Sequence, residues 1–286
     1  MNRTPQTTTQ TQLQPWTLPQ TTLDWYAAPR KLETMASNFA PISLKQMDGV
    51  MLLNRTDTKF VMTVSQLLFA LSKVQPDYWM LSINDQRLNH YRTLYFDTPD
   101  FALYHDHANG RAERYKVRSR EYTDSHLAFL EVKHKTRKDR TIKERIPTAT
   151  QVLQMTPDTN KWLHGISPLD GSVLEPKLWN TFTRLTLVSR KCCERVTLDV
   201  DLAFYTDRKV SHLDGLVVAE VKMDAAHGAS PFLSQMRAQR IHPNSFSKYS
   251  VGVAMLYDQV KKNAFKAKIL GLEKMMKGIS YNERFC

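Results

Sequence analysis

"RYKVRSR", residues 114–120, decides how the rest of the sequence is interpreted, because it carries a cation at every second position. Successive side chains of a β-strand point to opposite faces, so Arg114, Lys116, Arg118 and Arg120 would all lie on one face of a sheet. Like charges this close repel one another, and a bound anion would offset the repulsion. The stretch therefore predicts a strand and raises the question of which negative group it faces.

The composition is that of a globular and strongly basic protein. The chain has 286 residues, 42% of them hydrophobic, which is enough to bury a core. Its 40 Lys and Arg against 28 Asp and Glu give a net charge of +12, which indicates an anionic partner: nucleic acid, acidic lipid or a phosphorylated small molecule. We expect a cytoplasmic protein, since neither a membrane span nor a secretion signal is recognisable and the three cysteines form no disulfide framework or zinc spacing.

Most of the chain alternates between short strands and turns. The first 38 residues are rich in Thr, Gln and Pro, which predicts a disordered tail. Helices are expected at 43–53, at 63–74 behind a Thr63/Gln66 capping box, at 230–241, and as one long C-terminal helix from 247. Strands are expected at 54–62, 90–100, 114–122, 127–135, 140–147, 179–189, 193–205 and 215–224.

The same alternation of charge recurs in the other predicted strands. Beyond 114–120, one face would carry Arg55, Asp57, Lys59, Glu131, Lys133, Lys135, Lys143, Arg145, Arg184, Arg195, Asp199, Asp201, Glu220 and Lys222. A solvated face would explain any single strand. A solvated face explains all these strands together less well, because the repulsion between neighbouring cations accumulates. Two like charges ~5 Å apart repel by about 0.8 kcal/mol in water and about 3 kcal/mol at an effective dielectric near 20. The face therefore predicts a bound polyanion.

We expect an α+β fold: a closed antiparallel β-barrel of about eight strands, with helices packed outside and the cations lining a narrow lumen. Such a lumen favours a thin, flexible chain such as polyphosphate or a triphosphate tail over duplex nucleic acid. Single-stranded nucleic acid usually needs aromatic side chains on the binding face, and the aromatics here do not interleave with the cations. His105 and His107 have a metal-like spacing but no third ligand nearby, so a structural role is expected.

Several blocks, in order from about residue 39 to about residue 260, resemble the VTC domain. This is the polyphosphate polymerase branch of the triphosphate tunnel metalloenzymes, a CYTH-like superfamily. The blocks are "FAPISLKQMDGVMLLNRTDTKFVM", "YRTLYFDTPD", "YHDHANGRAERYKVRSREY", "FLEVKHKTRKDRTIKERI", "RVTLDVDL", "AEVK" and "SKYSVG". The resemblance implies a tunnel domain over residues 39–262, followed by a helix end and tail over 263–286.

The resemblance also implies an activity, which is transfer of the γ-phosphoryl group of ATP to a growing polyphosphate chain. It implies that Glu220 holds Mn²⁺ or Mg²⁺, and Glu131 is expected either to assist or to pair with Lys133 or a neighbouring arginine. The implied catalytic residues are Lys59, Arg118, Arg120, Lys133, Arg184 and Arg195, with Lys143 and Lys248 as further phosphate ligands. Alternation alone adds Arg55, Arg114, Lys116, Lys135, Arg145 and Lys222 as substrate contacts.

Two departures bear on the activity. Triphosphatases and cyclases of the superfamily begin with an acidic ExExK strand, whereas this chain has Arg55, Asp57 and Lys59 there, which favours the polymerase branch. Eukaryotic VTC domains carry a second lysine where this chain has Ser245, so a phosphate contact is expected to be missing. No SPX domain or membrane helix is recognisable, and a stand-alone bacterial form is the expectation.

Two alternatives stay open at this level: a hydrolase of tripolyphosphate or nucleoside triphosphate, and a non-catalytic polyphosphate-binding module. ATP and polyphosphate are the expected partners, while a membrane-protein partner and the oligomeric state stay open. Replacing Arg118 or Arg120 by Ala should abolish triphosphate binding and retain or stabilise the fold, because one like charge is removed.

Overall fold

The computed structural model describes residues 30–48, 55–138, 140–224 and 230–283. Its helices are α1 (Arg30–Ser37), α2 (Leu44–Asp48), α3 (Val64–Val74), α4 (Ala102–Ala108), α5 (Pro157–Ile166), α6 (Pro231–Ala238), α7 (Lys248–Leu256) and α8 (Asn263–Glu283). Its strands are β1 (Ala40–Ile42), β2 (Arg55–Thr63), β3 (Tyr78–Leu81), β4 (Asn89–Asp97), β5 (Arg114–Tyr122), β6 (Leu127–Lys135), β7 (Thr141–Thr148), β8 (Glu175–Ser189), β9 (Glu194–Tyr205), β10 (Val210–His212) and β11 (Leu216–Asp224).

One mixed sheet organises the molecule. Its main path runs β2-β11-β9-β8-β4-β5-β6-β7, and every neighbouring pair along this path is antiparallel. These eight strands are the eight that the sequence predicts. The short strands β1, β3 and β10, which carry too few residues to show an alternation, are not predicted.

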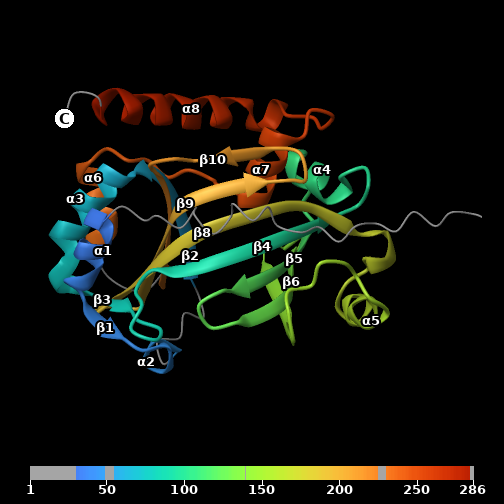
Figure 1. Cartoon of the computed structure of the whole chain (residues 1–286), viewed down its shortest axis with the longest axis horizontal. Helices are drawn as coiled ribbons and strands as arrows, with labels where there is room; N and C mark the ends of the chain where they lie inside the picture. Colours follow the sequence, from blue (N-terminus) through green and yellow to red (C-terminus); the bar gives the residue numbers. More distant parts are fainter. Residues whose placement is uncertain (1–29, 49–54, 139, 225–229, 284–286) are drawn as a thin grey trace, which may run out of the picture.

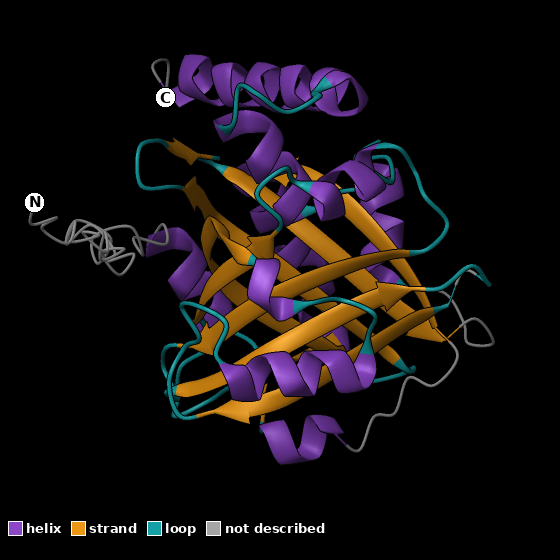
Figure 2. Ribbon diagram, turned by 90° about the vertical axis from the view of Figure 1, so that its right-hand side faces the viewer, coloured by secondary structure: helices purple, strands orange, loops and turns teal. Residues whose placement is uncertain are grey.

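The sheet is strongly curved but is not closed by hydrogen bonds. Among the described residues, the end strands β2 and β7 do not pair with each other, so the closure of the predicted barrel is not confirmed. The two halves of the sheet still face one another, since Lys59 of β2 and Arg114 of β5 line the same cavity. Figure 2 shows strands crossing in front of others as the sheet curls. Exposed charges on β7, Lys143 and Arg145, oppose pairing at this edge.

Helices cover the convex face in two groups. At one end α1, α3 and α6 bury Phe60, Leu198 and their neighbours, and at the other end α5 packs over β4, β5 and β6 (Figure 1). The N-terminus of α3 has the predicted capping box, in which Thr63 accepts from Gln66 N while the Gln66 side chain accepts from Thr63 N.

The concave face is charged in one half and apolar in the other. Val61, Phe182 and Val218 share that face with the cations, and they pack against α7 and α8. Gly252 allows the close approach of α7, since a Cβ there would lie 2.6 Å from Leu178 and 2.7 Å from Phe204. A helix therefore fills half of the face that was predicted to line an open lumen.

Two other predictions need correction, and one lies partly outside the described residues. The part of the predicted tail that the structure describes, residues 30–37, is helix α1, because Leu32 and Ala36 lie one turn apart and are both buried. Residues 1–29 and 49–54 lie outside the described residues, so only 44–48 of the helix predicted at 43–53 are seen. The predicted long C-terminal helix is interrupted between Leu256 and Asn263, where Tyr257 is extended. None of the helices in the described part of the chain is both long and apolar enough to cross a membrane.

Candidate functional site

The strand register brings the predicted cations onto one concave face. Residues directly opposite each other in an antiparallel pair share a face, and the register links Lys59 to Glu220, Arg184 to Asp199, and Arg118 to Glu131. By the same register the face carries Lys59, Arg114, Lys116, Arg118, Arg120, Lys133, Lys135, Lys143, Arg145, Arg184, Arg195 and Lys222. Arg55 belongs to β2 by its backbone, but its side chain lies outside the described residues.

Glu220 on β11 lies between two lysines. One carboxylate oxygen is 3.1 Å from Lys59 Nζ on β2, and the other is 3.0 Å from Lys222 Nζ. Burial alone would raise the pKa of Glu220, but Lys222 and Lys59 more than offset it and hold the pKa well below the usual range. The carboxyl is therefore ionised at neutral pH and fixed in position.

Glu131 on β6 is bound to arginines of β5. Arg118 Nε donates to Glu131 Oε2 at 2.6 Å, and Arg120 NH1 lies 4.0 Å from the same oxygen. Burial opposes ionisation, yet Arg118 and then Arg120 lower the pKa of Glu131 to about 2. Of the two expectations for Glu131, the ion pair with a neighbouring arginine is the one seen.

Asp199 on β9 is the most buried of the three carboxylates, with 3% exposure. Arg184 Nε and Nη2 donate to its two oxygens at 2.5 and 2.8 Å, and Lys248 Nζ at the start of α7 also donates to it. Burial is again outweighed, and Arg184 and Lys248 lower the pKa of Asp199 to about 2. Two cations from the candidate set are thus bonded to one buried carboxylate.

The position of Lys248 depends on a second buried carboxylate, Asp97, at the end of β4. Asp97 accepts from Leu103 N at 2.8 Å and Tyr104 N at 2.9 Å in α4, and from the Tyr249 hydroxyl in α7. This network ties α7 to the sheet one residue beyond Lys248. Alternation along strands carries no signal for such a contact, and Lys248 entered the sequence prediction by resemblance alone.

Lysines lie directly opposite one another on β5, β6 and β7. Lys116 faces Lys133, and Lys133 faces Lys143, so that three like charges follow one another across the sheet; we call this set the lysine ladder. Burial, Lys143 and Lys59 lower the pKa of Lys133 to about 8, although its side chain is exposed on the concave face. Burial and then Lys133 lower the pKa of Lys116 well below its ordinary value. Arg114 opposite Lys135 and Arg195 opposite Lys222 repeat the pattern.

Aromatic rings do lie among the cations, contrary to the sequence prediction. The Tyr91 ring centroid is 4.9 Å from Arg184 and 5.6 Å from Arg120, and Arg145 lies 4.6 Å from the Phe129 ring. Phe182 approaches both Arg184 and Lys248. Tyr91 and Phe182 are 6% and 0% exposed, so they support the cations from beneath and offer no free surface on which a base could stack.

Comparison with known sequence families agrees with this arrangement, since the sequence profile of the VTC domain matches residues 54–257. The chain belongs to the VTC domain family. The resemblance stated from the sequence blocks is thereby confirmed, and the match spans every strand of the sheet's main path. No curated protein matches the chain.

Among solved structures, this VTC domain is similar to candidate adenylate cyclases. One from Bacillus halodurans has 12% identity and a TM-score of 0.42, covering 72% of this chain and 98% of that one. One from Vibrio parahaemolyticus has 13% identity and a TM-score of 0.39, covering 68% and 94%. One from Hippeastrum, described as having a dominant triphosphatase activity, has 13% identity and a TM-score of 0.40, covering 70% and 95%. With TM-scores below 0.5, these similarities support no conclusion about substrate or activity.

The VTC domain offers a divalent cation few protein ligands. Within the described ranges, no group of three or more His, Cys, Asp or Glu side chains gathers around one point. Glu220 is a fixed carboxylate on the concave face, and Glu131 is bonded to arginine. This donor set fits Mg²⁺ or Mn²⁺ in the manner of nucleotide sites, where one or two carboxylates bind the ion and phosphate oxygens supply other ligands.

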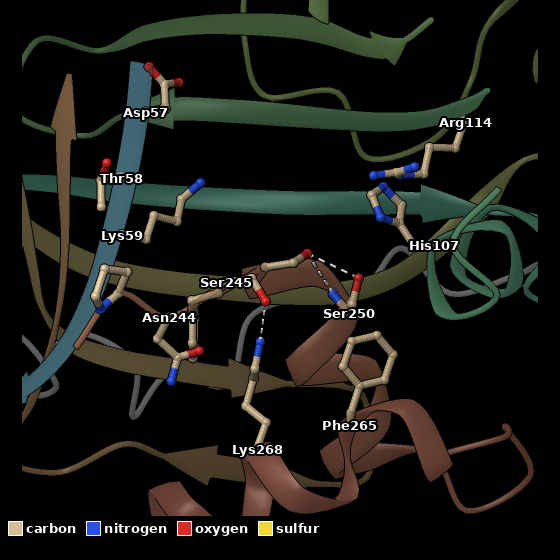
Figure 3. Close-up of a pocket in the computed structure, with 13 residues that line it drawn as sticks. Asp57, Thr58, Lys59, His107, Arg114, Asn244, Ser245, Ser250, Phe265 and Lys268 are labelled. Atoms are coloured by element: carbon tan, nitrogen blue, oxygen red, sulfur yellow. Dashed lines mark hydrogen bonds between the residues drawn. The ribbon is translucent and has the colours of Figure 1, made fainter. Parts of the chain in front are cut away.

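A cavity of about 530 Å³, which no sequence pattern predicted, lies at one end of the charged half (Figure 3). Lys59, Arg114 and Lys268 line it together with the loop that precedes α7. His107 also lines it, and burial, followed by Lys116 and Arg114, lowers the pKa of its imidazole to about 2. Lys268 lies on α8, outside the residues that match the family, so neither alternation nor resemblance pointed to it.

Proposed function

We propose that this VTC domain is a polyphosphate polymerase, which transfers the γ-phosphoryl group of ATP to a polyphosphate chain held on the concave face. The lysine ladder is the observation that carries the proposal. Lys116, Lys133 and Lys143 occupy directly opposite positions on three neighbouring strands, an arrangement that costs free energy in the absence of a ligand. A linear polyanion lying across the strands offsets that cost at each position.

Phosphoryl transfer depends mainly on positioning and on neutralising the transferring group. Lysine ammonium groups are compact and movable, so the ladder suits a chain that must advance after each transfer. Arg118, Arg120 and Arg184 are fixed by carboxylates and aromatic rings, so they suit the part of the substrate that must stay still. The concave face therefore combines arginines that hold the reacting part of the substrate in place with lysines along which the polyphosphate chain can advance.

Glu220 is the proposed ligand for Mn²⁺ or Mg²⁺, which when bound would neutralise charge on phosphate oxygens. Lys59 and Lys222 hold its carboxylate in place. The composition of β2 favours a polymerase over a hydrolase. This strand contributes Asp57 and Lys59, and among the described residues it offers no group of carboxylates that could build a carboxylate-rich metal site.

The test is to incubate the purified protein with ATP and Mn²⁺ and to separate the products on a gel. A polymerase yields ADP and a ladder of polyphosphate, a hydrolase yields ADP and inorganic phosphate only, and a binding module yields neither. Glu220→Gln should lower the rate roughly 100- to 1,000-fold by removing an electrostatic contact to the reacting group.

Glu144→Gln is the matched control, because Glu144 is exposed on β7 and its register partner Val132 belongs to the convex core. It should leave the rate unchanged. If Glu220→Gln formed polyphosphate as fast as the unchanged protein, Glu220 would not belong to the proposed site.

A further inference from the structure

The cavity at the end of the charged half continues the concave face. Lys59 bonds to Glu220 on that face and also lines the cavity, and Arg114 begins the strand that carries Lys116 and Arg118. In Figure 3 the side chains of Lys59 and Arg114 point into the cavity from opposite sides. A volume of about 530 Å³ is in the usual range of small-molecule sites. A chain bound along the lysine ladder therefore has a continuous path into this space.

Two lysines at this end, Lys116 and Lys268, are bound to neutral oxygens, in contrast to the cations beside Glu131, Asp199 and Glu220. Lys268 Nζ donates to Ser245 Oγ at 3.0 Å, and Lys116 Nζ donates to Ser247 Oγ at 2.8 Å. Within the described residues neither ammonium has a carboxylate partner. Ser245 lies in the loop that precedes α7, and Ser247 is the N-cap residue of α7. Both serines line the cavity.

Arg114 supplies a further polar group without a partner. Its NH1 donates to the carbonyl of Arg111, whereas its Nε is buried and, among the described residues, has no hydrogen-bond partner. Burying a guanidinium N–H without an acceptor is costly. Together with the neutral partners of Lys116 and Lys268, this atom indicates that an anionic ligand completes the arrangement.

We propose that this cavity binds the segment of the polyphosphate chain beyond the reacting phosphoryl group, and that Lys268 of α8 is one of its phosphate contacts. The inference rests on the proposed function for the identity of the polyanion. The Lys268 ammonium donates to Ser245 Oγ. Ser245 stands where the related eukaryotic domains have a lysine, so Lys268 is placed to supply the phosphate contact that was expected to be missing. Burial lowers the pKa of Lys268, and a bound phosphate would favour its charged form. A helix outside the matched domain thus completes the site.

The experiment measures the affinity of the full-length protein for long-chain polyphosphate and for ATP, without turnover. Lys268→Ala should weaken polyphosphate binding about tenfold, as expected for the loss of one charged hydrogen bond, and should leave ATP binding unchanged. The double variant Ser245→Lys/Lys268→Ala should restore polyphosphate binding, because it returns an ammonium to the same place. Lys266→Ala is the matched control, since Lys266 is exposed two residues earlier on α8 and does not line the cavity.

Three results would overturn the inference. They are equal losses in Lys268→Ala and Lys266→Ala, an equal loss of ATP binding in Lys268→Ala, and absence of polyphosphate binding by the unchanged protein. The gel assay distinguishes the two proposals. A protein that binds polyphosphate through Lys268 but forms no polymer retains the cavity assignment and loses the polymerase assignment.

Discussion

Positive charges are arranged differently in two regions of the same concave face. In the paired region, defined by Glu131, Asp199, Glu220 and the cations bound to them, every carboxylate lies against at least two cations. In the lysine ladder, cation lies opposite cation on three strands. In the paired region a carboxylate lies between each two cations and offsets part of their repulsion, whereas in the ladder like charges stand at directly opposite positions of the register. The first region should therefore govern stability and the second should govern affinity.

This difference changes one expectation from the sequence. Removing Arg118 was expected to relieve repulsion and to retain or stabilise the fold. Its Nε is bonded to Glu131, so Arg118→Ala would leave a largely buried carboxylate without its closest cation, with Arg120 at 4.0 Å and Arg145 opposite it on β7. The relief of repulsion belongs instead to the lysine ladder, and the predictions below separate the two regions on that basis.

The largest effect is expected from Asp199→Asn in the paired region. The change leaves Arg184 and Lys248 buried without their carboxylate, which typically costs about 3 to 5 kcal/mol of folding free energy. Urea unfolding followed by circular dichroism measures the loss. The control is Asp258→Asn, which also removes a carboxylate bonded to two lysines but on the exposed surface, and it should unfold as the unchanged protein does. Equal stability of the two variants would mean that the paired region does not hold the fold.

A smaller effect, of opposite kind, is expected from Lys133→Ala in the lysine ladder. The variant loses a charge that lies between Lys116 and Lys143, so its free energy of unfolding should be unchanged or higher, while its affinity for polyphosphate falls about tenfold or more. Calorimetric titration and urea unfolding measure both quantities. The control Lys161→Ala makes the same change in net charge at an exposed position of α5, on the convex side of the sheet, and should alter neither. A destabilised Lys133→Ala with normal affinity would reverse the assignment of the two regions.

The smallest effect is a pH dependence that moves stability and affinity in opposite directions. The pKa values of Lys133 and Lys248 are lowered to about 8 in the folded protein, below the ordinary lysine value. Between about pH 8 and about pH 10.5 the unfolded chain therefore binds more protons than the folded one, so these groups add stability as pH rises. Below about pH 8 both lysines are protonated in the folded and the unfolded chain, and the full cost of holding these charges near other cations is present.

Polyphosphate affinity should fall across the same pH range, because the ammonium groups lose their protons. Titrations between about pH 7 and about pH 9.5 would show the fall, and Lys133→Ala should show a shallower one. A flat affinity profile in the unchanged protein would mean that neither lysine meets the polyanion.

The strands and the charged face were predictable from the sequence because both are local patterns. Alternation in "RYKVRSR" and its counterparts places side chains on one face wherever a strand forms, and β5 and β6 have the predicted bounds. The Thr63 capping box is equally local. These predictions needed no information about which strands are neighbours.

Closure of the sheet and the contents of its concave face were not predictable in the same way, because they depend on long-range packing. One signal was present: on the same parity as Lys59 and Glu220 the strands continue into Val61 and Val218, which marks an apolar half. The sequence does not say that α7 covers it. Nor does any pattern bring Lys268 of α8 to Ser245, a contact between residues that are 23 positions apart.

The outer edge of β7, which pairs with no other strand in the described part of the chain, bears on how copies of this protein behave toward one another. An open edge of backbone N–H and C=O groups invites a strand from a neighbouring molecule, and charged side chains discourage that addition. Lys143, Glu144 and Arg145 supply such charges along β7. Removing these charges would leave the edge open to pairing with a second molecule, so Lys143 and Arg145, which we propose as polymer contacts, would also oppose association between molecules.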